Sequence, residues 1–175
     1  KDINNRNFSH NVIEKIVRDK HIKAWKLFLK SDSDYIIVFE DDSICQKSSK
    51  KRLNKILKNL SFQINKNIYL DLAGGYKLSD ILPVKNNIKN EICDMYIKNI
   101  YTNTACTYLL SRNLVIDFIK ILSKDNFSKD FPIDHLMNYL GFKSRKKAFS
   151  GHFVNPIFTH GSFKDNVESW QNHND

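Results

Sequence analysis

Residues 35–43, YIIVFEDDS, place three consecutive acidic side chains directly after an unbroken apolar run. The segment 35–40 is short and rich in β-branched residues, so it predicts a β-strand buried on both faces, as in a parallel sheet. Glu40, Asp41 and Asp42 lie at the carboxyl end of this strand. Neighbouring carboxylates repel one another, so this cluster needs either the solvation of an exposed turn or a bound cation.

The segments around this strand alternate between helical and strand-like patterns. Ser111 is a suitable N-cap, Pro132 suits a first helical position, and Gly141 suits a helix exit. Residues 76–92 are irregular and polar and predict a loop. The alternation indicates an α/β fold with a largely parallel or mixed sheet. The predicted helices cover 11–30, 50–62, 112–123 and 131–142, and the predicted strands cover 35–40, 67–75 and 104–111.

Length and composition indicate one globular domain over residues 1–175. Lysine and arginine number 28 against 19 acidic residues, a net charge of +9. Such a charge favours an anionic partner, either nucleic acid, an anionic membrane surface or a phosphorylated ligand, unless it only reflects a lysine-rich composition. The three cysteines have no metal or redox spacing, which indicates a reducing, cytoplasmic location. No apolar run is long enough to span a bilayer, and no signal-peptide pattern is present.

Four positions are candidates for site chemistry. Ligands bind outside the carboxyl ends of strands in open α/β sheets, where carboxylates can hold Mg²⁺ or Mn²⁺. Asp134, in the first turn of a predicted helix, either complements the helix dipole or serves as a general base, and the helix end is expected to lower its pKa. His160, beside Gly161, is either a surface histidine or a metal ligand. His21 interrupts an apolar helical stripe and is either a core residue or part of a site.

Several common site types are absent from the sequence. It contains no phosphate-binding glycine loop, dinucleotide fingerprint, HExxH or GxSxG motif. The lysines of 50–58 are spread around the polar face of a helix, which is typical of a solvated surface. Basic and aromatic residues are not clustered, so a nucleic-acid-binding domain is a weaker alternative and no specific nucleic acid is expected.

From about residue 16 to 170, the chain resembles glycosyltransferase family 25, which includes lipopolysaccharide-biosynthesis sugar transferases and collagen galactosyltransferases. Each motif is short, and the similarity rests on their shared order. The motifs are KHIKAWKLFLKSDSDYIIVFEDDS at 20–43, NTACTYLLSRNLVIDFI at 103–119, FPIDHL at 131–136 and NPIFTHGSFKDNVESW at 155–170.

The resemblance implies an A-type, Rossmann-like glycosyltransferase fold, with a mixed sheet flanked by helices. It also implies a UDP-sugar donor, Mn²⁺ or Mg²⁺ as cofactor, and inverting transfer of galactose or glucose to a glycan, lipopolysaccharide or hydroxylysine-type acceptor. Asp42 is then the first metal ligand, and His160 completes the metal site. A glycolipid acceptor would place the enzyme at the periphery of an anionic membrane.

The other candidates take roles from the same resemblance. Glu40 belongs to the shell around the sugar or nucleotide, and His21 to the nucleotide site. Asp134 is the expected base that takes the proton of the acceptor hydroxyl, with Asp41 as its rival.

The chain also departs from the family pattern. Lys20 stands where the family has serine before its histidine, and Thr104 or Ala105 replaces a glycine. The family's opening nucleotide-binding segment has no counterpart before residue 16, so we expect this chain to be a fragment of a longer protein. A catalytically degenerate binding module with the same fold is therefore the main alternative to an active transferase.

Overall fold

The computed structural model describes residues 8–60, 66–73, 88–89, 95–97, 104–125, 130–144, 148–153 and 155–161. Most of the loop expected at 76–92 lies outside the described residues, as does the chain after residue 161. In order, the elements are α1 (Phe8–Phe28), β1 (Tyr35–Phe39), β2 (Ser43–Cys45), α2 (Ser49–Leu60), β3 (Asn67–Asp71), β4 (Ile88–Lys89), β5 (Met95–Ile97), β6 (Thr107–Ser111), α4 (Arg112–Leu122), α5 (Ile133–Lys143), β7 (Ala148–Phe153) and β8 (Phe158–His160).

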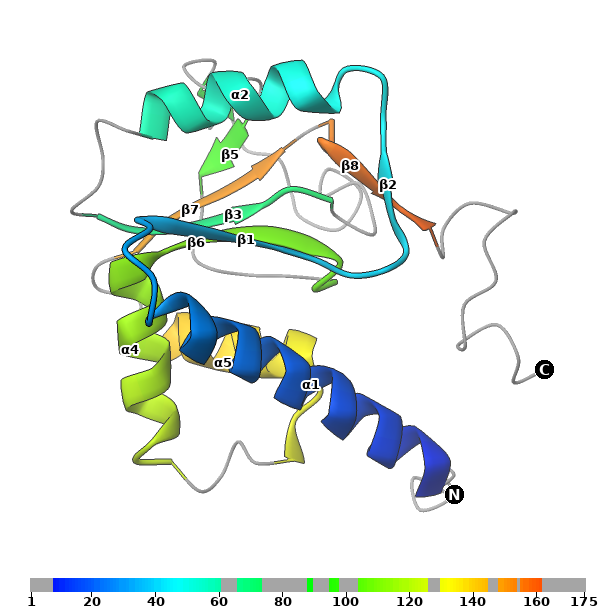
Figure 1. The fold of residues 1–175 in the computed structure, drawn as a ribbon, viewed down its shortest axis with the longest axis vertical. Coiled ribbons are helices and arrows are strands. Elements are labelled where there is room, and N and C mark those ends of the chain that lie inside the picture. Colours follow the sequence, from blue (N-terminus) through cyan, green and yellow to red (C-terminus); the bar gives the residue numbers. More distant parts are fainter. Residues whose placement is uncertain are drawn as a thin grey trace.

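The described residues form a mixed sheet between two helical layers. In Figure 1, α2 lies on one side of the sheet, and α1, α4 and α5 lie on the other. Because side chains alternate along a strand, β6 supplies both layers: Leu109 packs toward α2, whereas Tyr108 and Leu110 pack toward the three-helix side. The fold is therefore mixed α/β, as predicted, with both faces of the central strands buried.

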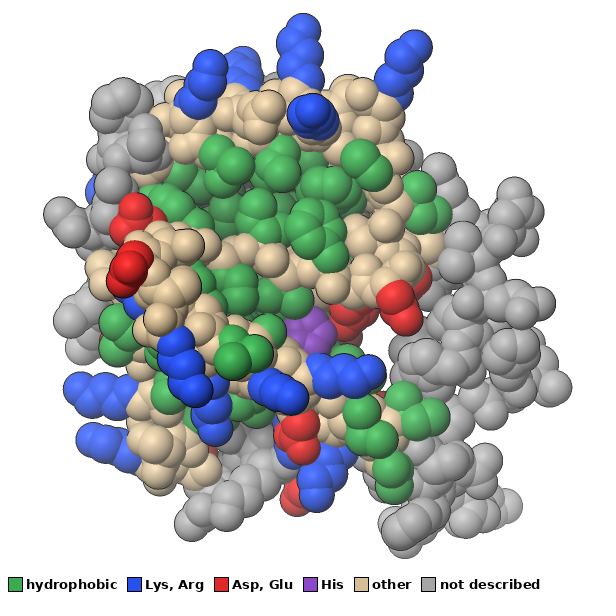
Figure 2. All heavy atoms as spheres, viewed as in Figure 1, with side chains coloured by type: hydrophobic (Ala, Val, Ile, Leu, Met, Phe, Trp, Pro, Cys, Tyr) green, Lys and Arg blue, Asp and Glu red, His purple; other side chains and the backbone are tan. Residues whose placement is uncertain are grey.

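The six-stranded sheet has the order β1-β6-β3-β7-β5-β4. Of its described pairs, β3 and β7 run parallel, and the other neighbours run antiparallel. The expectation that residues 35–40 form a strand buried on both faces of a parallel sheet is wrong. The strand β1 lies at the sheet edge and pairs antiparallel with β6, and Phe39 is 50% exposed. Figure 2 shows apolar side chains on the molecular surface between α2 and the sheet.

The helix ends agree with the sequence in part. Ser111 caps α4 as predicted, since its side chain accepts a hydrogen bond from the Leu114 amide. Pro132 occupies the N-cap of α5, one position before the predicted one. Gly141 was expected at the helix exit, but it is buried inside α5, which continues to Lys143. No helix in the described part of the chain is long and apolar enough to cross a membrane.

Candidate functional site

The turn that follows β1 is held by backbone hydrogen bonds on both sides. The Glu40 amide donates to the carbonyl of Cys106 (2.8 Å), the residue before β6 begins. The Gly161 amide, just after β8, donates to the carbonyl of Asp42 (2.8 Å). The two-stranded sheet of β2 and β8 continues this arrangement by pairing Ser43 with His160. Two distant segments, the start of β6 and the end of β8, therefore meet at the acidic turn.

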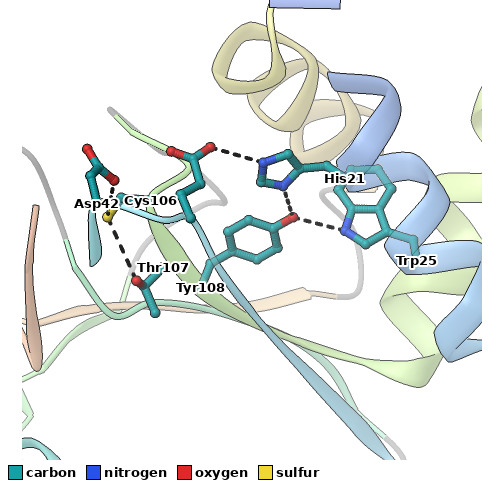
Figure 3. Close-up of polar contacts among 7 residues, drawn as sticks. His21, Trp25, Asp42, Cys106, Thr107 and Tyr108 are labelled. Atoms are coloured by element: carbon teal, nitrogen blue, oxygen red, sulfur yellow. Dashed lines mark hydrogen bonds and ion pairs between the residues drawn. The ribbon is translucent and has the colours of Figure 1, made fainter. Parts of the chain in front are cut away.

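Asp42, Cys106 and His160 come together at this meeting point. His160 Nδ1 lies 3.1 Å from Asp42 Oδ2. The Cys106 thiol donates to Asp42 Oδ1 at 3.5 Å (Figure 3). One potential ligand atom from each residue lies within 4.8 Å of the other two. A carboxylate oxygen, an imidazole nitrogen and a thiol sulfur are a donor set for a divalent transition metal, so these residues fit a bound cation.

The sequence provided no role for Cys106, because an isolated cysteine without a partner at metal-binding spacing carries no signal. Its side chain is buried, and burial, followed by the nearby Asp42 carboxylate, raises the pKa of the thiol well above its usual range. A bound cation at Asp42 would oppose both effects, because a metal favours the thiolate form.

His21 connects the end of β1 to the core beneath it. Its Nε2 atom lies 3.0 Å from Glu40 Oε1, and its Nδ1 atom lies 2.7 Å from the Tyr108 hydroxyl. The Trp25 indole donates to the same hydroxyl at 3.0 Å (Figure 3). With a neutral imidazole, the Tyr108 hydroxyl donates to His21 Nδ1 and His21 donates from Nε2 to Glu40, an arrangement in which each group has a partner. Histidine and acidic side chains meet in a hollow between α1 and the sheet (Figure 2).

Asp134 lies in the first turn of α5 and is mostly buried. The expectation that the helix end lowers its pKa is wrong. Burial, with a further contribution from the charge of Glu40, raises the pKa of Asp134 to about 7, although a backbone hydrogen bond from Ala105 opposes the shift. Loss of hydration and a like charge nearby outweigh the helix dipole here. A carboxyl group with a pKa near 7 suits a general base.

The remaining acidic residue of the turn, Asp41, is exposed. The structure therefore separates the three acids of the turn. Asp42 lies beside His160, and Glu40 beside His21 and close enough to Asp134 to raise its pKa.

A second buried pair, which the sequence reasoning missed, borders the site. Asp71 ends β3, and its Oδ2 atom lies 3.6 Å from Nδ1 of His152, its neighbour on β7. These side chains are 3% and 2% exposed, and the charge of Asp71 also raises the pKa of Asp134. Asp71 is the last residue of a buried strand, and Glu40 directly follows the apolar strand β1; this shared position at a strand end was the signal that could have identified Asp71.

Residues 20–137 match the model of a protein family described as glycosyltransferase family 25 (LPS biosynthesis protein). The match spans more than half of the chain, from the helix that carries His21 to the helix that carries Asp134. Asp42 and Cys106 lie inside the matched region, and His160 lies beyond it. No curated protein matches the chain.

Proposed function

This chain belongs to glycosyltransferase family 25, and from that premise we propose that it transfers a hexose, galactose or glucose, from a UDP-sugar to an acceptor hydroxyl with inversion at the anomeric carbon. The acceptor is a glycan, lipopolysaccharide or hydroxylysine-type group. The observation that carries the proposal is the placement of Asp42 beside His160, and of Glu40 close to Asp134, at one end of the sheet. Ligands bind outside such strand ends in α/β proteins.

We assign a divalent cation to Asp42 and His160. The family resemblance implies Mn²⁺ or Mg²⁺, and the cation would neutralise the negative charge that grows on the departing diphosphate. The short distance between Asp42 and His160 supports this assignment, as does the position of both residues at the turn that follows β1.

Asp134 is the proposed general base. It would accept the proton of the acceptor hydroxyl as that oxygen bonds to the anomeric carbon and the bond to UDP breaks, with its electron pair leaving on UDP. Its pKa near 7 and its burial near Glu40 favour this role. Asp41 remains the rival, and its exposure to solvent makes it the less favoured choice.

We propose that Glu40 contacts the sugar or the nucleotide of the donor, and that His21 belongs to the nucleotide-binding part of the site. Because both ring nitrogens of His21 already have partners in Tyr108 and Glu40, its main contribution would be to orient the Glu40 carboxylate. A carboxylate held in one orientation binds sugar hydroxyls with less loss of conformational entropy than a mobile one.

The test is UDP release by the full-length protein from UDP-galactose and UDP-glucose with Mn²⁺, across glycan, glycolipid and hydroxylysine acceptors. Asp42→Ala should lower turnover by roughly 10²–10³-fold, as for the loss of one charge-stabilising group elsewhere. Asp32→Ala removes an exposed acid outside the acidic turn and should leave turnover unchanged. Equal turnover in Asp42→Ala and the parent would rule out Asp42 as a ligand of a catalytic cation.

A catalytically degenerate binding module is the second candidate, and the lysine at position 20 in place of the family's serine favours it. This reading predicts that UDP or UDP-sugar binds, as calorimetry would detect, whereas no acceptor supports UDP release. Turnover with any donor and acceptor pair would exclude it.

A further inference from the structure

We propose that Cys106 is the third protein ligand of the metal site at Asp42 and His160, and that this site therefore prefers Zn²⁺ or Co²⁺ to Mn²⁺ or Mg²⁺. The inference rests on the proposed function only in that a metal binds at Asp42 and His160. It concerns this chain's own donor atoms and can be tested without any sugar transfer.

The distances place the sulfur among the other donors. Cys106 Sγ lies 3.5 Å from Asp42 Oδ1, and His160 Nδ1 lies 3.1 Å from Asp42 Oδ2. All three potential ligand atoms lie within 4.8 Å of one another, so small side-chain adjustments suffice to direct them at one ion. A metal that contacts Asp42 and His160 would have the Cys106 sulfur beside it.

The backbone brings the three residues together before any ion binds. The hydrogen bond from the Glu40 amide to the Cys106 carbonyl holds Cys106 against the acidic turn. The hydrogen bond from the Gly161 amide to the Asp42 carbonyl holds the end of β8 against the same turn. The Thr107 hydroxyl, 3.8 Å from Cys106 Sγ, is in turn hydrogen-bonded to the Ser43 hydroxyl at 2.6 Å. Outer contacts of this kind orient the ligands of metal sites.

The donor types determine which cation is preferred. Mg²⁺ prefers oxygen ligands and keeps several waters, and Mn²⁺ is likewise best served by carboxylates, carbonyls and water. Zn²⁺ binds thiolate, imidazole and carboxylate, and sites with three protein ligands keep a coordination position open. When the metal binds, the thiol S–H bond breaks, the proton passes to solvent, and the sulfur electron pair forms the bond to the metal. A diphosphate oxygen could take the open position.

The test is a Co²⁺ titration of the full-length, metal-free protein, because cobalt bound to thiolate gives a sulfur-to-metal charge-transfer absorption as well as visible ligand-field bands. The parent should show both. Cys106→Ser should lose the charge-transfer absorption and weaken Zn²⁺ binding by at least about 100-fold, the upper end of what the loss of an outer-shell partner costs. Cys45→Ser combined with Cys93→Ser leaves Cys106 as the single thiol among these 175 residues and should keep the absorption.

Each alternative outcome has a defined meaning. Cobalt binding without charge transfer in the parent would overturn the role of Cys106 but leave the metal site of the proposed function intact. Binding of Mn²⁺ alone, with no response to Zn²⁺ or Co²⁺, would overturn the preference. No metal binding at all would overturn both this inference and the metal role, whereas UDP release in the presence of a chelator would still support a transferase. If Cys106→Ser does not fold, Cys106→Ala and the spectrum of the parent decide the matter.

Discussion

The Nε2 atom of His21 lies 3.0 Å from Oε1 of Glu40. His21, on α1, thereby holds the carboxylate of Glu40, which directly follows β1. Nδ1 of the same histidine is hydrogen-bonded to the Tyr108 hydroxyl. Burial raises the pKa of Tyr108 well above its ordinary value, so its hydroxyl keeps the proton that it donates to His21. The orientation of Glu40 is therefore determined by the core beneath it.

Replacing His21 by phenylalanine should lower the free energy of unfolding by about 1–3 kcal/mol, because it removes a partner from the buried Tyr108 hydroxyl and from Glu40. Urea unfolding measures this change. Lys20→Ser, at the exposed neighbouring position, is the matched control and should change stability by less than about 0.5 kcal/mol. Equal stabilities of His21→Phe and the control would contradict the buried network.

Asp134→Asn should lower kcat by roughly 10²–10⁴-fold, which is the usual contribution of a general base. Asp41→Asn should have a much smaller effect, because Asp41 is exposed whereas Asp134 is mostly buried near Glu40. Steady-state turnover of both variants, with circular dichroism as a check on folding, decides between them. A large loss in Asp41→Asn with an active Asp134→Asn would reverse the assignment.

The pH dependence of turnover should report the same carboxyl group. Since the base must be ionised, kcat/KM should rise with pH and level off above about 7, the pKa of Asp134. Glu40→Gln removes a charge that raises this pKa, so the midpoint should move to lower pH whatever happens to the rate. A midpoint that does not move in Glu40→Gln would indicate that another group is titrating.

The raised pKa of Asp134 should make the folded protein less stable as pH rises. The pKa of Asp134 is about 7 in the folded chain against an ordinary 3.8, so the folded state binds more protons between these values. The free energy of unfolding should therefore fall as pH rises from about 4 to about 7. At pH 8, Asp134→Asn should be more stable than the parent, by up to about 4 kcal/mol at about 1.4 kcal/mol per unit.

Thermal unfolding at pH 4 and pH 8 measures this effect, with the difference expected to be small at pH 4. Asp32→Asn, an exposed acid, should shift the melting temperature little at either pH. An Asp134→Asn variant that is less stable than the parent at pH 8 would show that the native carboxylate is stabilised by its surroundings.

The basic face of α2 leads to a prediction about membranes. Lys50, Lys51 and Lys55 are exposed on this helix. Figure 2 shows basic side chains projecting from the outer side of α2. If the acceptor is lipid-linked, the protein should float with anionic liposomes at low salt, and Lys→Gln at all three positions should weaken binding at least about tenfold, since each lysine near the surface contributes about 1 kcal/mol. Changing Lys23, Lys26 and Lys30 of α1 removes equal charge from the other side of the sheet and should matter less. No flotation of the parent would count against the membrane role.

Much of the secondary structure could be predicted, because hydrophobic periodicity is a local property. The helices α1, α2, α4 and α5 and the strands β1, β3 and β6 lie where apolar spacing placed them, and Ser111 caps α4. Strand pairing could not be predicted in the same way. An apolar run such as 35–39 suits a central parallel strand or an edge strand covered by helices, and its partner β6 comes from a distant part of the chain.

The candidate site divides along the same line. The position of Glu40, Asp41 and Asp42 at the end of a strand is written in one short stretch of sequence. The sequence does not show that these acids lie in different surroundings, because those surroundings depend on residues from other elements. His21 lies beside Glu40, and His160 lies beside Asp42.

By itself, the sequence determined the α/β class, the family resemblance and the acidic end of β1, since each depends on residue types and short spacings. Tertiary structure alone decided that Cys106 joins Asp42 and His160, and that Asp134 has a raised rather than a lowered pKa. The physical reason is that ligand geometry and pKa values depend on desolvation and on charges only a few ångströms away, and in this fold those neighbours come from distant segments of the chain.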